Sequence, residues 1–229
     1  SYDLYAACKT VVVIDHHRKM VNHIDNAVIF YHEPYASSAS EMVAEMLPYF
    51  GEKRRITRVE AEALLAGIML DTKNFVMRAG VRTFEAAAYL RRMGADTVEV
   101  RKLFSTSMEE YRSRTKIISS TQIYRRCAIA GVNEPLEHVK LVAPQAADEL
   151  LNITDVDASF ALYEYDGGVS ISARSMGAVN VQVIMERLGG GGHQTMAATQ
   201  MSGITFDEAY QKLLAAIDEF YQSRGGRQP

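Results

Sequence analysis

The sequence has few of the residues that would anchor a small secreted fold. Its 229 residues include only 2 cysteines, 5 prolines and no tryptophan. Cys8 and Cys127 lie far apart and in no C-x-x-C spacing, which excludes a disulfide framework and a thiolate zinc site and favours a reducing cytoplasm. No apolar run approaches the roughly 20 residues that span a bilayer, so we do not expect the chain itself to be embedded in a membrane.

The chain also lacks an excess of charge of either sign. It has 25 basic and 28 acidic residues, for a net charge of −3, and a pI near 6.1. A protein that tracks long nucleic acids shows a basic face and aromatic side chains on which bases stack, so we expect no long nucleic acid as a partner. The sequence starts without Met or a basic signal region, and we expect it to be an excised piece of a longer protein.

Two patterns of secondary-structure signals divide the sequence into two regions. Residues 1–105 alternate strand and helix signals, which predicts an α/β fold with a mostly parallel sheet flanked by helices. After a connecting helix over 106–120, period-two alternation over 121–224 predicts a smaller α+β domain. The tail 225–229 is expected to be disordered.

Within these domains the patterns predict individual elements. Val11 to Ile14 is predicted to be a strand buried on both faces, and Ile123, Cys127 and Ile129 alternate along one predicted strand. Asp166-Gly167 predicts a type I′ hairpin turn. Helices are predicted from Ser40, from a capping box of Thr57 with Glu60, from a cap at Thr83, from Asp96, from Ser107 with Glu110, and over 138–151, 180–188 and 206–222.

Three potential metal ligands, Asp15, His16 and His17, follow the first predicted strand. Carboxylate and neutral imidazole suit Mn, Zn or Fe, although a solvated polar loop fits these three residues equally well. Asp71 ends a later predicted helix, where the helix dipole disfavours a negative charge and a cation would stabilise it. His23, Asp25 and His32 match no ligand spacing, and we assign them ordinary roles.

A second candidate site lies in the later domain. Asn180 is placed to cap a helix that Gly189 ends, and the following glycines let backbone amides approach a phosphate closely. Arg174 offers a planar fork for phosphate oxygens. A flexible linker and a solvated edge-strand arginine are the alternatives. The sharper hypothesis is a nucleotide pocket made by Arg174, Asn180, Gly191, Gly192 and His193.

These motifs, in this order, resemble the DHH phosphoesterase family with its DHH-associated C-terminal domain, and most closely its membrane-anchored bacterial cyclic-di-AMP phosphodiesterases. The resemblance implies that His16 and Asp71 bind one ion of a two-manganese (Mn²⁺) centre. It implies that His17 contacts or protonates the reacting phosphate and that Asp15 orients the histidines. It also implies a cytoplasmic module of a parent protein anchored in the cell membrane.

The sequence departs from this family in one respect. Complete members carry an earlier H-x-x-x-D-x-D segment and a bridging aspartate, and neither lies in these 229 residues. Two protein ligands cannot hold two metal ions, so we expect this fragment to be inactive. The resemblance implies that the parent protein hydrolyses cyclic di-AMP to linear pApA. The nucleotide pocket is expected to face the metal cleft.

Two other functions stay open. One is a nanoRNase or pAp phosphatase of the same superfamily, acting on a short linear dinucleotide. The other is a non-catalytic, nucleotide-binding regulatory module. The sequence leaves open whether the chain forms a homodimer.

Overall fold

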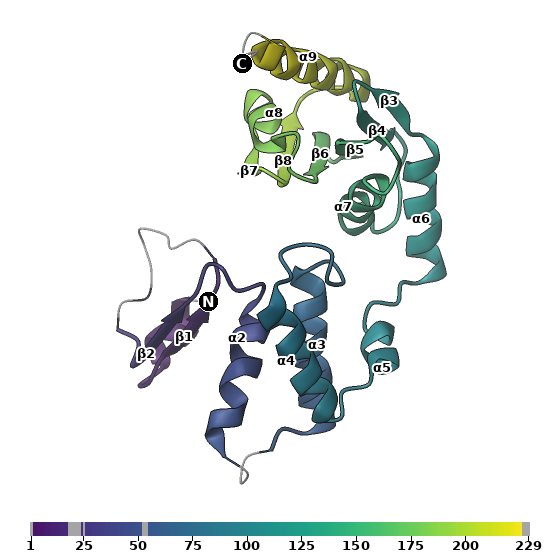
Figure 1. The fold of residues 1–229 in the computed structure, drawn as a ribbon. Helices are drawn as coiled ribbons and strands as arrows, with labels where there is room; N and C mark the ends of the chain where they lie inside the picture. Colours follow the sequence, from purple (N-terminus) through teal and green to yellow (C-terminus); the bar gives the residue numbers. More distant parts are fainter. Residues whose placement is uncertain (1, 18–23, 25, 52–54, 226–229) are drawn as a thin grey trace. The chain divides into compact units, whose positions relative to one another are not determined.

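The computed structural model describes residues 2–17, 24, 26–51 and 55–225, and the predicted disordered tail beyond 225 lies outside these residues. The described chain is mixed α/β (Figure 1) and divides into two compact units, Ser1–Ser105 and Thr106–Pro229. Each unit is described by itself.

The first unit combines a short parallel sheet with a group of helices. Strand β1 (Val12–Asp15) pairs in parallel with β2 (Ile29–His32), and their ends meet in the pair Asp15 and His32. The helical elements are α1 (Tyr2–Ala7), α2 (Ala39–Met46), the 3-10 helix η1 (Leu47–Phe50), α3 (Arg58–Asp71), α4 (Val81–Arg92) and α5 (Thr97–Lys102).

The buried core of this unit is formed by its helices. Leu65 and Ile68 of α3 pack with Leu90 of α4 and Val100 of α5, and Figure 1 shows α2, α3 and α4 side by side. The prediction that Val11 to Ile14 is buried on both faces is wrong, because Val12 is 50% exposed. β2 is the only strand that pairs with β1 among the described residues.

Most helix starts follow the sequence signals, although α2 begins at Ala39 with Ser38, and not Ser40, at its N-terminus. Thr57 and Glu60 form the predicted capping box at α3, and Ser107 and Glu110 form another at α6 (Met108–Ser119). α4 begins earlier than predicted, with Gly80 as its N-cap, and the Thr83 hydroxyl accepts a hydrogen bond from the Gly80 N–H. Thr83 therefore stabilises this helix start from inside its first turn.

The second unit contains a six-stranded sheet in the order β3-β4-β5-β6-β8-β7. β4 and β5 are parallel and the other neighbours antiparallel. Besides α6, its elements are β3 (Gln122–Tyr124), β4 (Cys127–Val132), α7 (Val139–Leu150), β5 (Ala158–Tyr165), β6 (Gly168–Ser175), α8 (Val181–Arg187), β7 (Gly191–His193), β8 (Met196–Ser202) and α9 (Phe206–Gly225).

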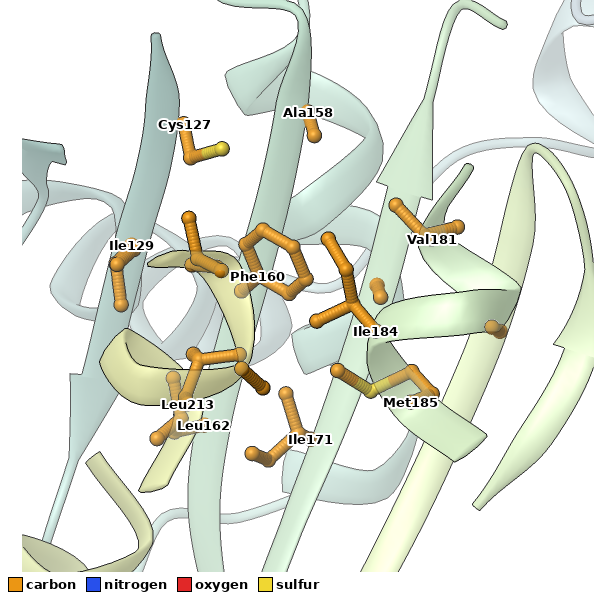
Figure 2. Close-up of a cluster of buried hydrophobic side chains, with 14 of the residues drawn as sticks. Cys127, Ile129, Ala158, Phe160, Leu162, Ile171, Val181, Ile184, Met185 and Leu213 are labelled. Atoms are coloured by element: carbon orange, nitrogen blue, oxygen red, sulfur yellow. The ribbon is translucent and has the colours of Figure 1, made fainter. Parts of the chain in front are cut away.

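Helices cover both faces of this sheet. Phe160 and Ile171 pack with Ile184 of α8 and Leu213 of α9 on one face, as Figure 2 shows. On the other face, Ala130 and Ala161 pack with α7 and with Ile117 of α6. Alternating side chains of the same strands thus pack into two hydrophobic cores, one on each face of the sheet, which explains the period-two pattern in the sequence.

Two hairpin turns differ from the predictions. The single predicted strand through Ile123 and Ile129 is two strands, because Arg125 and Arg126 adopt φ values of 46° and 61° and reverse the chain. A type I′ turn needs positive φ at both central residues, and no glycine or asparagine marks this one. The predicted hairpin at Asp166-Gly167 forms, but only Gly167 of the two has a positive φ, so that turn is not type I′.

Candidate functional site

The Asp15-His16-His17 segment is fixed by hydrogen bonds at the end of β1. The His17 backbone N–H donates to the Asp15 Oδ1 at 3.0 Å, and the His17 ring Nδ1 lies 2.8 Å from the same oxygen. The backbone hydrogen bond is the largest of the effects that hold the pKa of Asp15 below its usual value. His32, at the end of β2, lies with its ring Nε2 2.6 Å from the His17 carbonyl oxygen.

His16 and Asp71 come together from different parts of the first unit. His16 Nε2 lies 3.5 Å from Asp71 Oδ2, with the imidazole 10% exposed and the carboxylate 41% exposed. His16 Nδ1 is buried and has no hydrogen-bond partner among the described residues. A buried polar atom without a partner costs about 1–3 kcal/mol, so the described residues leave Nδ1 of this ring unsatisfied while Nε2 faces Asp71.

The chain leaves Asp71 through a left-handed turn. Lys73, Asn74 and Phe75 have φ values of 49°, 58° and 66°, a conformation that costs roughly 1–2 kcal/mol per residue other than glycine. The buried Thr72 hydroxyl stabilises the turn, because it donates to the Ile68 carbonyl at 2.7 Å and accepts from the Phe75 N–H at 2.9 Å. The position of Asp71 at the end of α3 is thereby fixed.

These residues fit a divalent cation. Two ligand atoms bound to one ion at about 2.0–2.2 Å lie roughly 3.0–3.5 Å apart, and the His16 and Asp71 atoms have that separation. The carboxylate supplies negative charge at a helix C-terminus, where a cation is favoured. His16 and Asp71 supply two ligand atoms, whereas the one group of three possible ligands among the described residues is the exposed Glu109, Glu137 and His138 of the second unit.

Residues of the second candidate site lie in one row across the sheet. Arg174 of β6 is opposite Met196 of β8, and Met196 is opposite His193 of β7. Side chains directly opposite one another share a face. Arg174, Met196 and His193, which we call the cross-strand row, therefore project from one face, with the outer two about 10 Å apart by strand spacing.

The second half of the glycine run is a strand, whereas Gly189 and Gly190 form the connection from α8. Gly191 to His193 form β7, at the edge of the sheet. A Cβ on Gly191 would meet nothing within 4 Å, whereas a Cβ on Gly192 would lie 2.5 Å from the Met196 carbonyl oxygen. Gly191 thus leaves open space on the face of the cross-strand row, and Gly192 is required for the close pairing with β8.

Asn180 caps α8 as predicted. Its Oδ1 accepts a hydrogen bond from the Gln182 N–H at 3.1 Å, and the next residue, Val181, donates its N–H to the Gln194 carbonyl at 3.0 Å. The start of α8 is therefore joined to the turn that follows His193. The structure brings Arg174, Gly191 and His193 to one face, with Asn180 at the adjoining helix start.

Three neighbours of these sites were not predicted from the sequence. His32 was assigned an ordinary role, although the rule that parallel strands end at one edge could have identified it. Met196 carries no sequence signal, because its place follows from the pairing of β8 between β6 and β7. Thr72 follows Asp71 directly and could have been suspected as a side-chain cap. His23 and Asp25 lie outside the described residues.

Comparisons with known proteins agree with this organisation. Residues 2–68 match the family model described as the DHH family, N-terminal domain, and residues 136–223 match the DHHA1 domain. Together the two matches cover more than half of the chain. The first includes Asp15, His16 and His17, and the second includes Arg174 and His193.

The chain is also similar to characterised proteins. Over 216 residues, 93% of its length, it is 50% identical to the cyclic-di-AMP phosphodiesterase GdpP of Bacillus subtilis. The aligned region covers 33% of that protein. Over 222 residues, 96% of its length, it is 43% identical to the cyclic-di-AMP phosphodiesterase PdeA of Listeria monocytogenes. The aligned region covers 34% of that protein. The chain thus spans about a third of the length of these relatives.

A solved structure shares the fold. An exopolyphosphatase-related protein from Bacteroides fragilis matches 95% of this chain and 66% of its own, with a TM-score of 0.82 and 24% sequence identity. In the part of this chain that the structure describes, no helix is both long enough and apolar enough to cross a membrane.

Proposed function

The chain belongs to the DHH phosphoesterase family and carries a DHHA1 domain, and from this premise we propose that it is the catalytic part of a metal-dependent phosphodiesterase that hydrolyses cyclic di-AMP to linear pApA. The substrate follows from the relatives, two of which are named as cyclic-di-AMP phosphodiesterases and share 43% to 50% of their aligned residues with nearly the whole chain.

The observation that carries the proposal is the meeting of His16 with Asp71 at 3.5 Å. The two residues are 55 positions apart in the sequence, and one nitrogen of the buried His16 ring has no protein partner among the described residues. The His16 Nε2 and the Asp71 Oδ2 are separated as two ligands of one ion would be. His16 and Asp71 would hold the ion, which we propose to be Mn²⁺.

A bound divalent ion would supply two effects, a lower pKa for the attacking water and neutralisation of charge on the phosphoryl oxygens. The protein's own residues do the positioning. Asp15 accepts from both the His17 N–H and its ring Nδ1, which leaves the His17 Nε2 to donate a proton or hydrogen bond to a phosphate oxygen. Because Asp15 has a lowered pKa, it stays ionised and keeps accepting both hydrogen bonds from His17.

The second unit would hold the nucleotide. The Arg174 guanidinium can bind phosphate oxygens with two parallel N–H donors, and the open Gly191 lets a ligand approach the sheet closely. His193, on the same face, can contact a phosphate or stack on a base. Asn180 stabilises the adjoining helix start and is available as a further polar contact.

The proposed site is incomplete within these 229 residues. The H-x-x-x-D-x-D segment of complete family members supplies most ligands of a two-ion centre, and it does not occur in this sequence. We therefore propose that the 229-residue chain binds nucleotide but does not hydrolyse it. Hydrolysis is proposed for the longer parent protein, which we infer to be anchored in the cell membrane with this module in the cytoplasm.

The test is hydrolysis of cyclic di-AMP by the longer protein in Mn²⁺. We expect His16→Ala and Asp71→Asn each to reduce turnover by more than about 100-fold, because changes in residues that only support ligands already cost 10–100-fold. Asp155→Asn, at an exposed carboxylate of the second unit, is the matched control for Asp71→Asn and should leave turnover unchanged. Unchanged turnover in either ligand variant, with the fold intact by circular dichroism, would contradict the assignment.

The same assay separates the alternatives. Faster hydrolysis of pAp or short RNA than of cyclic di-AMP would indicate a nanoRNase or pAp phosphatase. Nucleotide binding without turnover in the longer protein would indicate a regulatory module. Sedimentation of the same preparations measures whether the protein forms a homodimer.

A further inference from the structure

We propose that Asp148 is a positioning residue, which holds the Arg174 side chain ready for the phosphate of a nucleotide. The inference rests on the proposed function, because it takes Arg174 as the phosphate contact. Asp148 lies on α7 and Arg174 on β6, and the Asp148 Oδ1 is 3.1 Å from the Arg174 Nε.

The sheet explains why these two residues meet. Across from Arg174 on β5 is Ser159, on the opposite side from Met196. Ser159 is fully buried, and its hydroxyl donates to the carbonyl of Ala147 on α7 at 2.5 Å. The helix therefore covers the face up to Ser159, and Arg174 is the next position outward. Asp148 directly follows Ala147, so its carboxylate is at the edge of the covered region.

The exposure of the side chains marks the same edge. Arg174 is 11% exposed and Met196, one strand further, is 46% exposed. The cross-strand row thus passes from beneath α7 into solvent at Arg174. A guanidinium at this edge lies between the covered face and solvent, which suits contact with an anion.

The hydrogen bonds of Arg174 leave one nitrogen of its guanidinium group available to a ligand. Its Nε contacts Asp148, and its Nη1 donates to the Ala173 carbonyl at 3.0 Å. Among the described residues, no protein acceptor lies at Nη2 of Arg174. Two contacts hold the plane of the group while Nη2 keeps its two N–H donors for a ligand.

Asp148 has two opposing effects on an anionic ligand. By holding Arg174 it reduces the rotamer freedom that binding would otherwise remove, which improves affinity. By its own negative charge it repels a phosphate, which weakens affinity. Replacing the carboxylate with an amide of the same shape removes the repulsion and weakens the hold on Arg174, because a charge-assisted hydrogen bond becomes a neutral one. The direction of the change in affinity therefore decides which effect dominates.

The experiment is calorimetric titration of the 229-residue chain with pApA. We expect Asp148→Asn to weaken binding about tenfold, which corresponds to loss of one held, rotamer-rich side chain. Arg174→Ala should weaken it further, and the double variant should bind no worse than Arg174→Ala alone, because Asp148 acts through Arg174. Asp157→Asn, which removes a comparable ion pair with Arg126, is the matched control with unchanged affinity.

Equal or tighter binding by Asp148→Asn would overturn the inference, since it would show that only repulsion was removed. Additive losses in the double variant would overturn it as well. If the unchanged chain bound neither pApA nor cyclic di-AMP, the proposed function of the site would fail, and the role of Asp148 with it.

Discussion

The two candidate sites are built by different means. In the first unit, the site residues lie at the ends of elements, with Asp15 closing β1 and Asp71 closing α3. In the second unit, the cross-strand row lies within strands, and its neighbours are fixed by sheet register. Residues at the ends of elements can be recognised from local patterns, whereas residues brought together by register depend on strand order. The comparison shows why one site was easier to predict in detail.

The two units also differ in how their strands are buried. In the first, the described strands contribute nothing to the buried hydrophobic cluster, which comes from the helices. In the second, β4, β5 and β6 supply the middle of both cores. The stability of the second unit should therefore depend on its strand residues, and that of the first on its helix residues.

The largest expected effect is on the core of the second unit. Phe160→Ala removes a fully buried ring beside Ile184 and Leu213 (Figure 2), and it should lower the free energy of unfolding of that unit by about 3–5 kcal/mol. The measurement is chemical denaturation, with hydrogen exchange used to monitor the unfolding of each unit separately. Phe50→Ala, at a half-exposed position of the first unit, is the control. A Phe160→Ala variant with unchanged stability would remove the contrast between the cores.

The next effect concerns the two cysteines, one in each unit. Cys8 is exposed, whereas burial raises the pKa of the Cys127 thiol to about 11. Because the thiolate is the reactive form, alkylation by iodoacetamide at pH 8 should be at least about 100-fold faster at Cys8 than at Cys127. Mass spectrometry of the labelled peptides gives both rates from one sample. Similar rates would mean that the second unit opens readily around β4.

The smallest effect is on the acid stability of the second unit. The pKa of Asp157 is lowered chiefly by hydrogen bonding to the Arg126 side chain. A lowered pKa means that the ionised form stabilises the fold above its usual pKa, near 3.8, and that this contribution disappears as the pH falls through the lower, folded value. Asp157→Asn should cost about 1 kcal/mol or less at pH 7 and nothing at the acid end.

Thermal unfolding between pH 2 and pH 7 measures this difference. A loss of stability in Asp157→Asn that stayed constant down to pH 2 would contradict the assigned cause.

Most helices of both units could be predicted from the sequence, because their starts are encoded in neighbouring residues. Thr57 with Glu60 and Ser107 with Glu110 form the expected capping boxes. The strands were less predictable. Arg125 and Arg126 form a tight turn without any residue type that marks one, since ion pairs to Asp218 and Asp157 hold them there. The exposed β1 looked like a buried strand because burial depends on what pairs beside it.

The candidate sites were predictable in residue identity but not in arrangement. Asp15, His16, His17 and Asp71 carry their own chemical signal, as does the glycine run before His193. The contacts of Asp148 and Met196 carry none, because each depends on which helix or strand lies alongside.

The sequence by itself determined the helix starts, the two patterns of secondary-structure signals and the chemical groups of both sites, since these depend on residues close together along the chain. Only the tertiary structure decided that β8 lies between β6 and β7 and that α7 ends its coverage at Arg174. Those outcomes depend on pairing and packing between segments that are distant in sequence, and no local pattern encodes the partner.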